Sequence, residues 1–377
     1  MATTNGYTER DYTDFAHTGP GTLAGRYLRT FWQPVYPAGE LPAGRAMPIR
    51  IMSEDFTLYR GEGGQPHLVD YRCAHRGTQL STGWVEGDCI RCFYHGWKYD
   101  GSGQCVEQPA EDVSFASQVK IRSYPTQEYL GLIFAYLGDG GPPPLPRHLD
   151  FEREGVVDAG FSLQAYNYFQ HLENSCDPVH VAFVHRNSEY RGLSGCPQVS
   201  VEETDYGMEI RALRSNGVRV THCVMPAGMR IRVAPRTPET GWRDMMLWEV
   251  PVDDTAHRAF MSLFVDVTGE AAQCYWETPD WMIRGNRDMS EGEEVLAGKL
   301  RLDDVDHTLS NLINLQDYVA QRGQGTIADR NHERLGRADL AVFMLRRLWA
   351  RELKALAAGR PLKQWRVPVE LATTLGM

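Results

Sequence analysis

Two pairs of potential metal ligands constrain the fold of this chain more than any other feature of its sequence. Cys73 and His75 form a Cys-x-His pair, and Cys92 and His95 form a Cys-x-x-His pair 16 residues further on. Zinc sites usually group cysteine with cysteine and histidine with histidine. Two mixed pairs instead fit a two-iron cluster in which one iron takes two thiolates and the other takes two imidazoles. A zinc ribbon, or two unrelated turns, is the plainer alternative.

The other cysteines do not extend this pattern. Cys89 is a rival ligand three residues before Cys92, but no histidine stands at the matching offset, and Cys105 is expected in the core. The chain has eight cysteines in 377 residues, and its start lacks the basic and apolar regions of a secretion signal. These features argue against a disulfide framework, and we expect a cytoplasmic protein.

Charge and hydropathy narrow the class of partner. The formal net charge is −10, which argues against a surface for nucleic acid or for anionic membranes. No run of about 18 apolar residues is present, so no transmembrane helix is expected. Hydrophobic residues make up 42% of the chain, which is enough to form substantial cores.

Turn signals and composition divide the chain into segments. Residues 46–137 contain short strands separated by turn signals and predict a small all-β domain. Residues 138–150 are too rich in Pro and Gly for a helix or a strand, so we expect a linker there. Residues 1–45 are expected to pack on the second domain, which comprises residues 151–377.

The second domain combines strands with helices. Strand-like segments between residues 199 and 268 predict one antiparallel sheet, and amphipathic segments at 303–322 and 338–358 predict two helices. In the first domain, residues 129–138 form a nearly continuous apolar run that predicts a single strand. The expected fold class is α+β, with an all-β domain followed by an antiparallel sheet flanked by helices.

A second group of potential ligands has the pattern Asp177-x-x-His180-x-x-x-x-His185. Histidines five residues apart are offset by about 140° on an ideal helix, so they converge on one metal only if the helix is interrupted. The Asp-Pro pair at the start of the motif provides a local helix start. Because the surrounding run is apolar, two buried core histidines are the alternative interpretation.

Together the two groups resemble the catalytic subunit of the Rieske non-haem iron aromatic oxygenases. The run from Cys92 to Trp97, CFYHGW, is similar to the second cluster-binding loop of Rieske proteins. The motif of Asp177 follows roughly eighty residues later, as in that family. The segments ENSCDPVH and NLQDYVAQRGQGTIADR most resemble the phthalate-dioxygenase-like branch, and the resemblance covers nearly the whole chain.

The resemblance implies two metal cofactors. Cys73, His75, Cys92 and His95 would hold a Rieske [2Fe–2S] cluster. A mononuclear Fe(II) would be bound by two histidines and a carboxylate, a set that leaves positions open for dioxygen. The corresponding residues here are His180, His185 and a later aspartate.

Several aspartates compete for the third position. Asp317 is favoured, because it stands where the branch places its carboxylate and on the same face as Ile313, where an unpaired charge would be costly. The rivals, which suit a solvent-exposed position better, are Asp303, Asp304 and Asp306. His307 and Glu333 are expected at the surface.

The resemblance also implies an activity and partners. The chain would be the terminal oxygenase component of a Rieske system that takes electrons from a separate NADH-dependent reductase or ferredoxin. It would oxygenate an aromatic acid or a methoxylated aromatic by monooxygenation, O-demethylation or ring hydroxylation. Homotrimers are implied, in which the cluster of one subunit serves the iron of the next. Asp177 would hydrogen-bond to an iron-binding histidine of its own subunit and to a cluster-binding histidine of the neighbouring subunit. This contact would give Asp177 a catalytic role.

Three alternatives remain open at this point. One is an aromatic ring dioxygenase that forms a cis-diol at the same kind of iron site. Another is a Rieske electron carrier without oxygenase chemistry, which would have no use for the second group of ligands. The last is a zinc-stabilised binding module.

Substrate and partner surfaces are less constrained. Arg230 and Arg232 share one face of an expected strand and could clamp a substrate carboxylate, or form a solvated outer face. An apolar patch that lines a pocket, or simply fills the core, comprises Trp242, Met245, Met246 and Trp248. A positive patch that could dock an acidic ferredoxin-like partner comprises Arg72, Arg76, Arg91 and Lys98.

Overall fold

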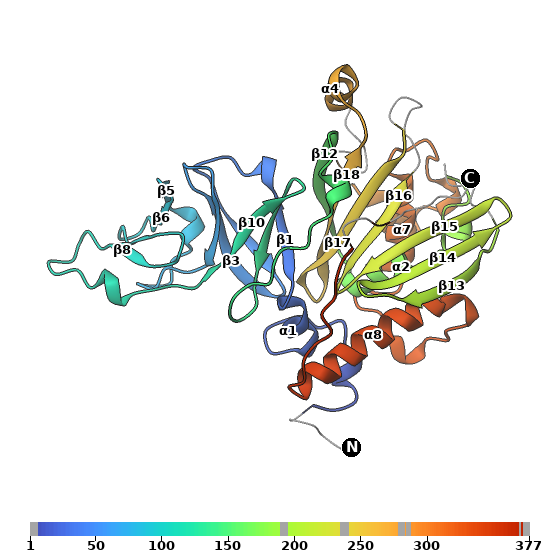
Figure 1. Ribbon diagram of the computed structural model, residues 1–377, viewed down its shortest axis with the longest axis horizontal. Coiled ribbons are helices and arrows are strands. Elements are labelled where there is room, and N and C mark those ends of the chain that lie inside the picture. The colour runs from blue at the N-terminus through green and yellow to red at the C-terminus, as the bar shows by residue number, and fades with distance from the viewer. Residues whose placement is uncertain are drawn as a thin grey trace.

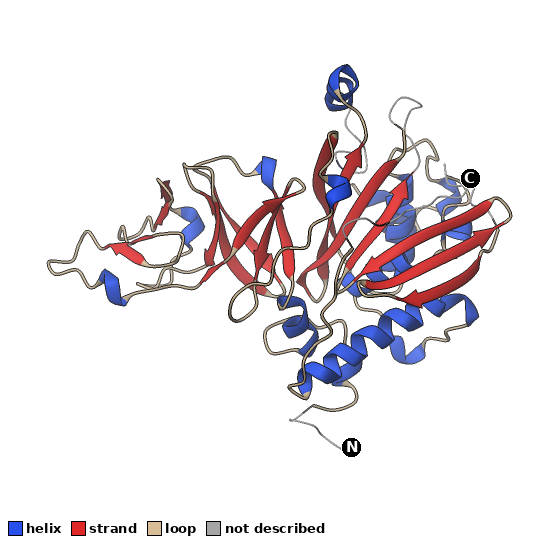
Figure 2. Cartoon of the chain, in the orientation of Figure 1, coloured by secondary structure: helices blue, strands red, loops and turns tan. Residues whose placement is uncertain are grey.

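The computed structural model describes residues 7–188, 195–233, 241–277, 283, 288–368 and 371. It has a small β-rich lobe at one end and a large sheet with its helices at the other (Figure 1). Strands dominate both lobes, and the longest helices accompany only the large sheet (Figure 2), so the predicted α+β class is confirmed. Within the described part of the chain, no helix is long and apolar enough to cross a membrane.

The small lobe contains three antiparallel sheets. The first has the order β2 (Ala46–Ile51), β3 (Glu54–Arg60), β4 (Pro66–Asp70) and β9 (Ser123–Tyr124). The second has the order β5 (Trp84–Glu86), β6 (Cys89–Arg91), β7 (Lys98–Tyr99) and β8 (Cys105–Glu107). The third has the order β1 (Trp32–Pro37), β11 (Leu132–Tyr136) and β10 (Thr126–Tyr129).

The large sheet has seven antiparallel strands. Its order is β12 (Val156–Gln164), β18 (Ala256–Val265), β17 (Arg243–Asp253), β16 (Gly228–Val233), β15 (Gly217–Val224), β14 (Gly207–Arg214) and β13 (Gln198–Glu203). Because side chains alternate along a strand, Met229 and Ile231 of β16 point to one face and Arg230 to the other. The small lobe packs on the Arg230 face, where Phe134 of β11 meets Trp248 of β17 with ring centroids 5.5 Å apart.

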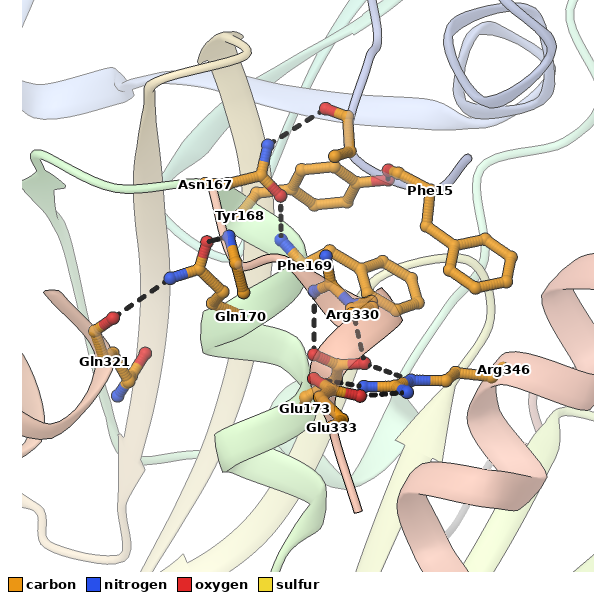
Figure 3. Close-up of polar contacts among 12 residues, drawn as sticks. Phe15, Asn167, Tyr168, Phe169, Gln170, Glu173, Gln321, Arg330, Glu333 and Arg346 are labelled. Carbon is orange, nitrogen blue, oxygen red and sulfur yellow. Dashed lines mark hydrogen bonds and ion pairs between the residues drawn. The ribbon is translucent and has the colours of Figure 1, made fainter. Parts of the chain in front are cut away.

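The described helices are α1 (Leu23–Arg29), α2 (Tyr168–Cys176), α3 (Val181–Val184), α4 (Gly269–Glu277), α6 (Ser290–Leu296), α7 (Leu312–Arg322) and α8 (Leu340–Ala357). Polar contacts tie α2 to distant parts of the chain (Figure 3). The Asn167 side chain caps its first turn, and Gln170 Nε2 donates to the carbonyl of Gln321 at 2.9 Å. Glu173 forms ion pairs with Arg330 and Arg346. These contacts fix the helix that leads into the second group of ligands.

Two predicted elements differ from the structure. The helix expected over 303–322 begins only at Leu312, because the Asp306 side chain accepts bonds from the backbone N–H and hydroxyl of Thr308 and forms a turn. The single strand expected over 129–138 is a hairpin that turns at Leu130 and Gly131, both with positive φ. The helix expected over 338–358 is confirmed as α8 to within two residues at each end.

Candidate metal centres

Two loops of the small lobe present the first group of ligands in nearly the same way. In each loop, the backbone N–H of a glycine donates to the carbonyl of the cysteine four residues earlier, at 2.9 Å for Gly77 and Cys73 and 3.0 Å for Gly96 and Cys92. Both glycines have positive φ, 76° and 74°, a conformation that other residues adopt at a cost. The sequence thus builds two matching turns, each closed by a glycine.

The side chains of the two loops meet. The thiols of Cys73 and Cys92 are buried, whereas the imidazoles of His75 and His95 are only half-buried, with ring centroids 4.6 Å apart. The Tyr99 hydroxyl lies 3.2 Å from the Cys73 sulfur, and burial raises the pKa of that thiol. Buried thiols with imidazoles toward solvent fit a cluster whose thiolate-bound iron is inside and whose imidazole-bound iron is at the surface.

The two remaining cysteines of this lobe occupy other places. Cys89 lies in the short strand β6, and Cys105 is buried in the same apolar core as Cys73 and Cys92, as predicted for a core residue. His75 stacks on Trp97 with ring centroids 4.6 Å apart, which fixes the orientation of its imidazole.

The second group of ligands forms where helical structure breaks. Helix α2 ends at Cys176, and the next helix, α3, has only four residues, flanked by His180 and His185. This interruption lets both imidazoles turn toward Asp317 of α7, as the five-residue spacing requires. The Asp317 Oδ1 atom lies 3.3 Å from His185 Nε2 and 3.7 Å from His180 Nε2. One ligand atom from each of the three residues lies within 4.8 Å of the others.

Proton positions at this group favour a cation. The Nδ1 atom of His185 lies 3.0 Å from the Gln316 side-chain oxygen, which can only accept, so Nδ1 carries a proton and a neutral His185 presents a lone pair on Nε2. That lone pair faces the Asp317 carboxylate, whose Oδ1 atom lies 3.3 Å away. Two acceptors that face one another at this distance fit a metal ion between them.

Asp177 lies beside this group but is not hydrogen-bonded to a ligand ring. Its carboxylate accepts the backbone N–H of Val179 at 2.7 Å and lies 3.9 Å from Nδ1 of His180. That Nδ1 atom is buried and has no hydrogen-bond partner. A short rearrangement of the Asp177 side chain would bring the two groups into contact.

A largely apolar pocket opens beside the second group. Its apolar lining includes Val181, Ile210, Met229, Ile231, Met245 and Leu247. Asp317 and Ile313 both line it, so they share a face of α7 as predicted. The aspartates that compete with Asp317 in the sequence are exposed: Asp303, Asp304 and Asp306.

Arg230 and Arg232 do not line this pocket. They lie on the opposite face of the sheet, where Arg230 forms an ion pair with Asp150 and Arg232 forms one with Asp244. The proposed clamp of a substrate carboxylate by these two residues is therefore wrong. The solvated alternative is also wrong for Arg230, which is 1% exposed.

The two predicted patches are divided in the structure. Met245 lines the pocket, whereas Met246 and Trp248 lie on the other face of the sheet, and Trp242 is exposed before β17 begins. The positive patch is smaller than expected. Its members Arg91 and Lys98 both form ion pairs with Glu107, which leaves two exposed arginines, Arg72 and Arg76.

The sequence did not identify two residues that support the ligands. Gln316 holds His185, and Asn174 donates to the Asp317 carboxylate at 3.2 Å. The available signals were weak. Gln316 directly precedes Asp317, and Asn174 stands three residues before Asp177 in the same motif.

Known proteins resemble this chain in sequence. Residues 31–125 match the family model of the Rieske [2Fe-2S] domain. The chain is 33% identical over 358 residues to the 5,5'-dehydrodivanillate O-demethylase oxygenase subunit of Sphingobium sp. (strain NBRC 103272 / SYK-6). The aligned region covers 91% of this chain and 80% of that protein. It is 32% identical to the phenoxybenzoate dioxygenase subunit alpha of Ectopseudomonas oleovorans, with 90% and 84% covered.

Solved structures share the fold. The terminal oxygenase of carbazole 1,9a-dioxygenase from Novosphingobium sp. KA1 superposes with a TM-score of 0.66 at 22% sequence identity. The match covers 90% of this chain and 94% of that one. The arrangement of a small β lobe and a seven-stranded sheet with helices is therefore that of known terminal oxygenases.

Proposed function

The chain belongs to the Rieske non-haem iron oxygenases, and from this premise we propose that it is a terminal oxygenase acting on an aromatic acid or a methoxylated aromatic. Its enzyme class is that of oxidoreductases that incorporate oxygen, with a Rieske [2Fe–2S] cluster and a mononuclear iron as cofactors. The observation that carries the proposal is the convergence of His180, His185 and Asp317 beside an apolar pocket.

We assign each cofactor to named residues. Cys73, His75, Cys92 and His95 hold the cluster, and the set of two imidazoles and one carboxylate holds the iron. When bound, the iron supplies dioxygen activation with electrons that the cluster delivers. The chain itself orients the ligands: Gln316 keeps the proton of His185 on Nδ1, and Asn174 holds the carboxylate of Asp317.

The lining of the pocket supports an aromatic acid as substrate. Apolar side chains of the sheet exclude water and match a ring, while Arg219 carries the one permanent positive charge among the described residues that line the pocket. A guanidinium at this place would pair with a carboxylate and orient the ring toward the iron ligands. The same pairing with the carboxylate is expected for aromatic acids that carry a methoxy group.

The surface around the first group of ligands supports docking of a separate electron donor. Phe93 and Tyr94 are about half exposed beside His95, and Arg72 and Arg76 are exposed around His75. Half-buried imidazoles surrounded by apolar and positive side chains suit a partner with an acidic rim, such as a ferredoxin or a reductase domain.

The separation of the two groups of ligands within one chain supports a homotrimer. Strands β5, β6 and β8, next to the cluster loops, lie at one end of the molecule, while α2 and α7 lie toward the other end (Figure 1). Electron transfer between sites so placed within one chain is unfavourable, and a neighbouring copy could bring its cluster close to Asp177, whose side chain is 25% exposed. We keep cytoplasmic localisation as a prediction.

The first test combines metal analysis with turnover. Anaerobically purified protein should contain at least three irons and two acid-labile sulfides per chain and give a Rieske EPR signal after reduction. With NADH and a reductase, methoxybenzoates should yield formaldehyde as oxygen is consumed. Formation of a cis-diol that carries both atoms of labelled dioxygen would instead identify the ring-dioxygenase alternative. Zinc without sulfide would contradict the proposal, and cluster reduction without oxygen uptake would indicate an electron carrier.

Substrate recognition has its own test. Arg219→Gln should raise KM for aromatic acids by about 10–100-fold, the range expected for loss of one hydrogen bond to a charged group. Turnover of uncharged aromatic analogues should change little. Arg211→Gln is the matched control, because Arg211 lies on the neighbouring strand, is exposed and pairs with Glu209. Equal effects of both substitutions would exclude Arg219 as the anchor.

A further inference from the structure

A third group of potential ligands lies inside the large domain, next to the pocket. His171 of α2, Glu249 of β17 and His257 of β18 bring one ligand atom each to a common point. The His171 Nδ1 atom lies 2.8 Å from His257 Nε2 and 3.2 Å from Glu249 Oε2, which in turn lies 3.3 Å from His257 Nε2. Glu249 is 2% exposed and His257 is fully buried.

This group has more lone pairs than protons. The Nδ1 atom of His257 lies 2.8 Å from the carbonyl oxygen of Tyr166, which can only accept, so a neutral His257 presents a lone pair on Nε2. Only the Nδ1 proton of His171 remains for both that lone pair and the carboxylate. Neither oxygen of Glu249 has a hydrogen-bond partner of good geometry. A buried carboxylate in this state is costly unless a cation neutralises it.

We propose that His171, Glu249 and His257 bind a divalent transition-metal ion, in addition to the cluster and the mononuclear iron. Nitrogen and oxygen ligands at about 2.0–2.2 Å from a metal stand about 2.8–3.6 Å apart for bond angles between 90° and 109°. The three distances between the ligand atoms, 2.8, 3.2 and 3.3 Å, fall in this range. Two imidazoles and one carboxylate select Zn(II) or Fe(II) over Mg(II) or Ca(II), which prefer oxygen.

The competing explanation is a second proton. Burial opposes a charge on His171, but the Glu249 carboxylate outweighs it and raises the pKa of that imidazole. A protonated His171 would give a metal-free ion pair with Glu249. The two explanations differ in a quantity that can be counted, namely the number of metal ions per chain.

The ion would connect elements that shape the active site. His171 and Asn174 lie one turn apart on α2 and both line the pocket. A metal bound here would fix this face of α2 to β17 and β18, and the pocket provides its route of entry. Its role would be to hold α2 in place, independently of the reaction that the iron supports.

Metal counting tests the proposal without relying on activity. A variant with both His180→Ala and Asp317→Ala lacks the mononuclear site, and it should retain one divalent ion per chain beyond the two irons that accompany two sulfides. Adding His257→Gln should remove that ion. His222→Gln is the matched control, a buried histidine of the same sheet that pairs with the Tyr206 hydroxyl, and it should keep the ion. No ion beyond the cluster irons in the double variant would overturn the proposal.

Anomalous diffraction on the unmodified protein decides the question if a variant fails to fold. Data at the iron and zinc edges should show a peak between His171, Glu249 and His257, separate from any peak at Asp317. A peak at Asp317 with none at the third group would overturn the proposal while leaving the oxygenase assignment intact. The reverse result would support the third site and count against the assigned mononuclear site instead.

Discussion

The two iron-binding regions that we propose differ in how the chain supplies their ligands. The four cluster ligands fall between Cys73 and His95, on two turns that repeat the same backbone bond and the same positive-φ glycine. The mononuclear site takes two histidines from the interrupted helix after α2, but its carboxylate comes from Asp317, far along the chain in α7. The first region is therefore defined by local structure and the second by the packing of helices.

This difference predicts separate vulnerabilities. The turns of the cluster loops are held by bonds within each loop, so they depend little on the large domain. The second site depends on the placement of α7 against α2, to which the Gln170–Gln321 and Asn174–Asp317 contacts contribute. Substitutions at the second site should therefore spare the cluster.

The largest effect is expected for Asp317→Ala. Loss of the proposed carboxylate ligand should remove the mononuclear iron and reduce activity by more than the roughly 100-fold that loss of a supporting residue costs. The Rieske EPR signal and the sulfide content should be unchanged. Iron and sulfide assays with steady-state rates measure both effects. Asp303→Ala, at an exposed aspartate, is the control. Loss of the cluster in Asp317→Ala would contradict the independence of the two regions.

The second prediction concerns communication between the regions. Asp177→Asn should leave both metal sites filled but slow turnover by about 10–100-fold, the range for a residue that orients a metal ligand. Its carboxylate is 3.9 Å from His180 Nδ1 and partly exposed, so it can face a neighbouring subunit. Single-turnover oxidation of the reduced cluster, with substrate present, measures the step. Normal activity and normal electron transfer in this variant would exclude the role of Asp177.

The same contrast explains what the sequence could predict. The spacing of Cys73, His75, Cys92 and His95 indicates a mixed-ligand cluster directly, because the relevant geometry is local. The spacing of His180 and His185 required an interrupted helix, and the structure has one after Cys176. The family match and the described fold then confirmed the oxygenase class.

Features set by tertiary contacts were harder to predict. Asp317 was favoured over Asp303 by resemblance to a family and by its place on the same face as Ile313, but the spacing alone does not specify which aspartate meets His180 and His185. Whether the Arg230 side chain points toward the pocket or away from it depends on which face of the sheet the small lobe covers. Alternation along a strand does not specify that face. The group of His171, Glu249 and His257 joins a helix to two strands and leaves no local pattern.

The third prediction tests the junction between the regions by pH. His148 lies in the connecting segment, and burial lowers its pKa to about 4. Between pH 6.5 and 4 the unfolded chain therefore binds a proton that the folded chain does not, so stability falls as the pH falls. At pH 5 the proton uptake by the unfolded chain lowers the free energy of unfolding by about 2 kcal/mol. His148→Gln should reduce the loss of melting temperature between pH 7 and pH 5.

A control keeps the pH effect specific. His332→Gln replaces a histidine whose side chain is 84% exposed, and it should leave the acid dependence of melting unchanged. If the cluster absorbance and the helical signal melt together and shift together in His148→Gln, the two regions depend on one another for stability. An unchanged acid dependence in His148→Gln would show that the junction does not control acid unfolding.

The smallest effect is expected for Gln316→Leu. The side-chain oxygen of Gln316 fixes the proton of His185 on Nδ1, so its loss should weaken iron binding by about 10-fold, the lower end of the range for such partners. Reconstitution of the apo site with Fe(II), followed by activity, measures the affinity while the cluster signal reports on the other region. Gln324→Leu, at an exposed glutamine just after α7, is the matched control. Unchanged iron affinity in Gln316→Leu would mean that α7 positions Asp317 and His185 without this bond, so that helix packing alone defines the second site.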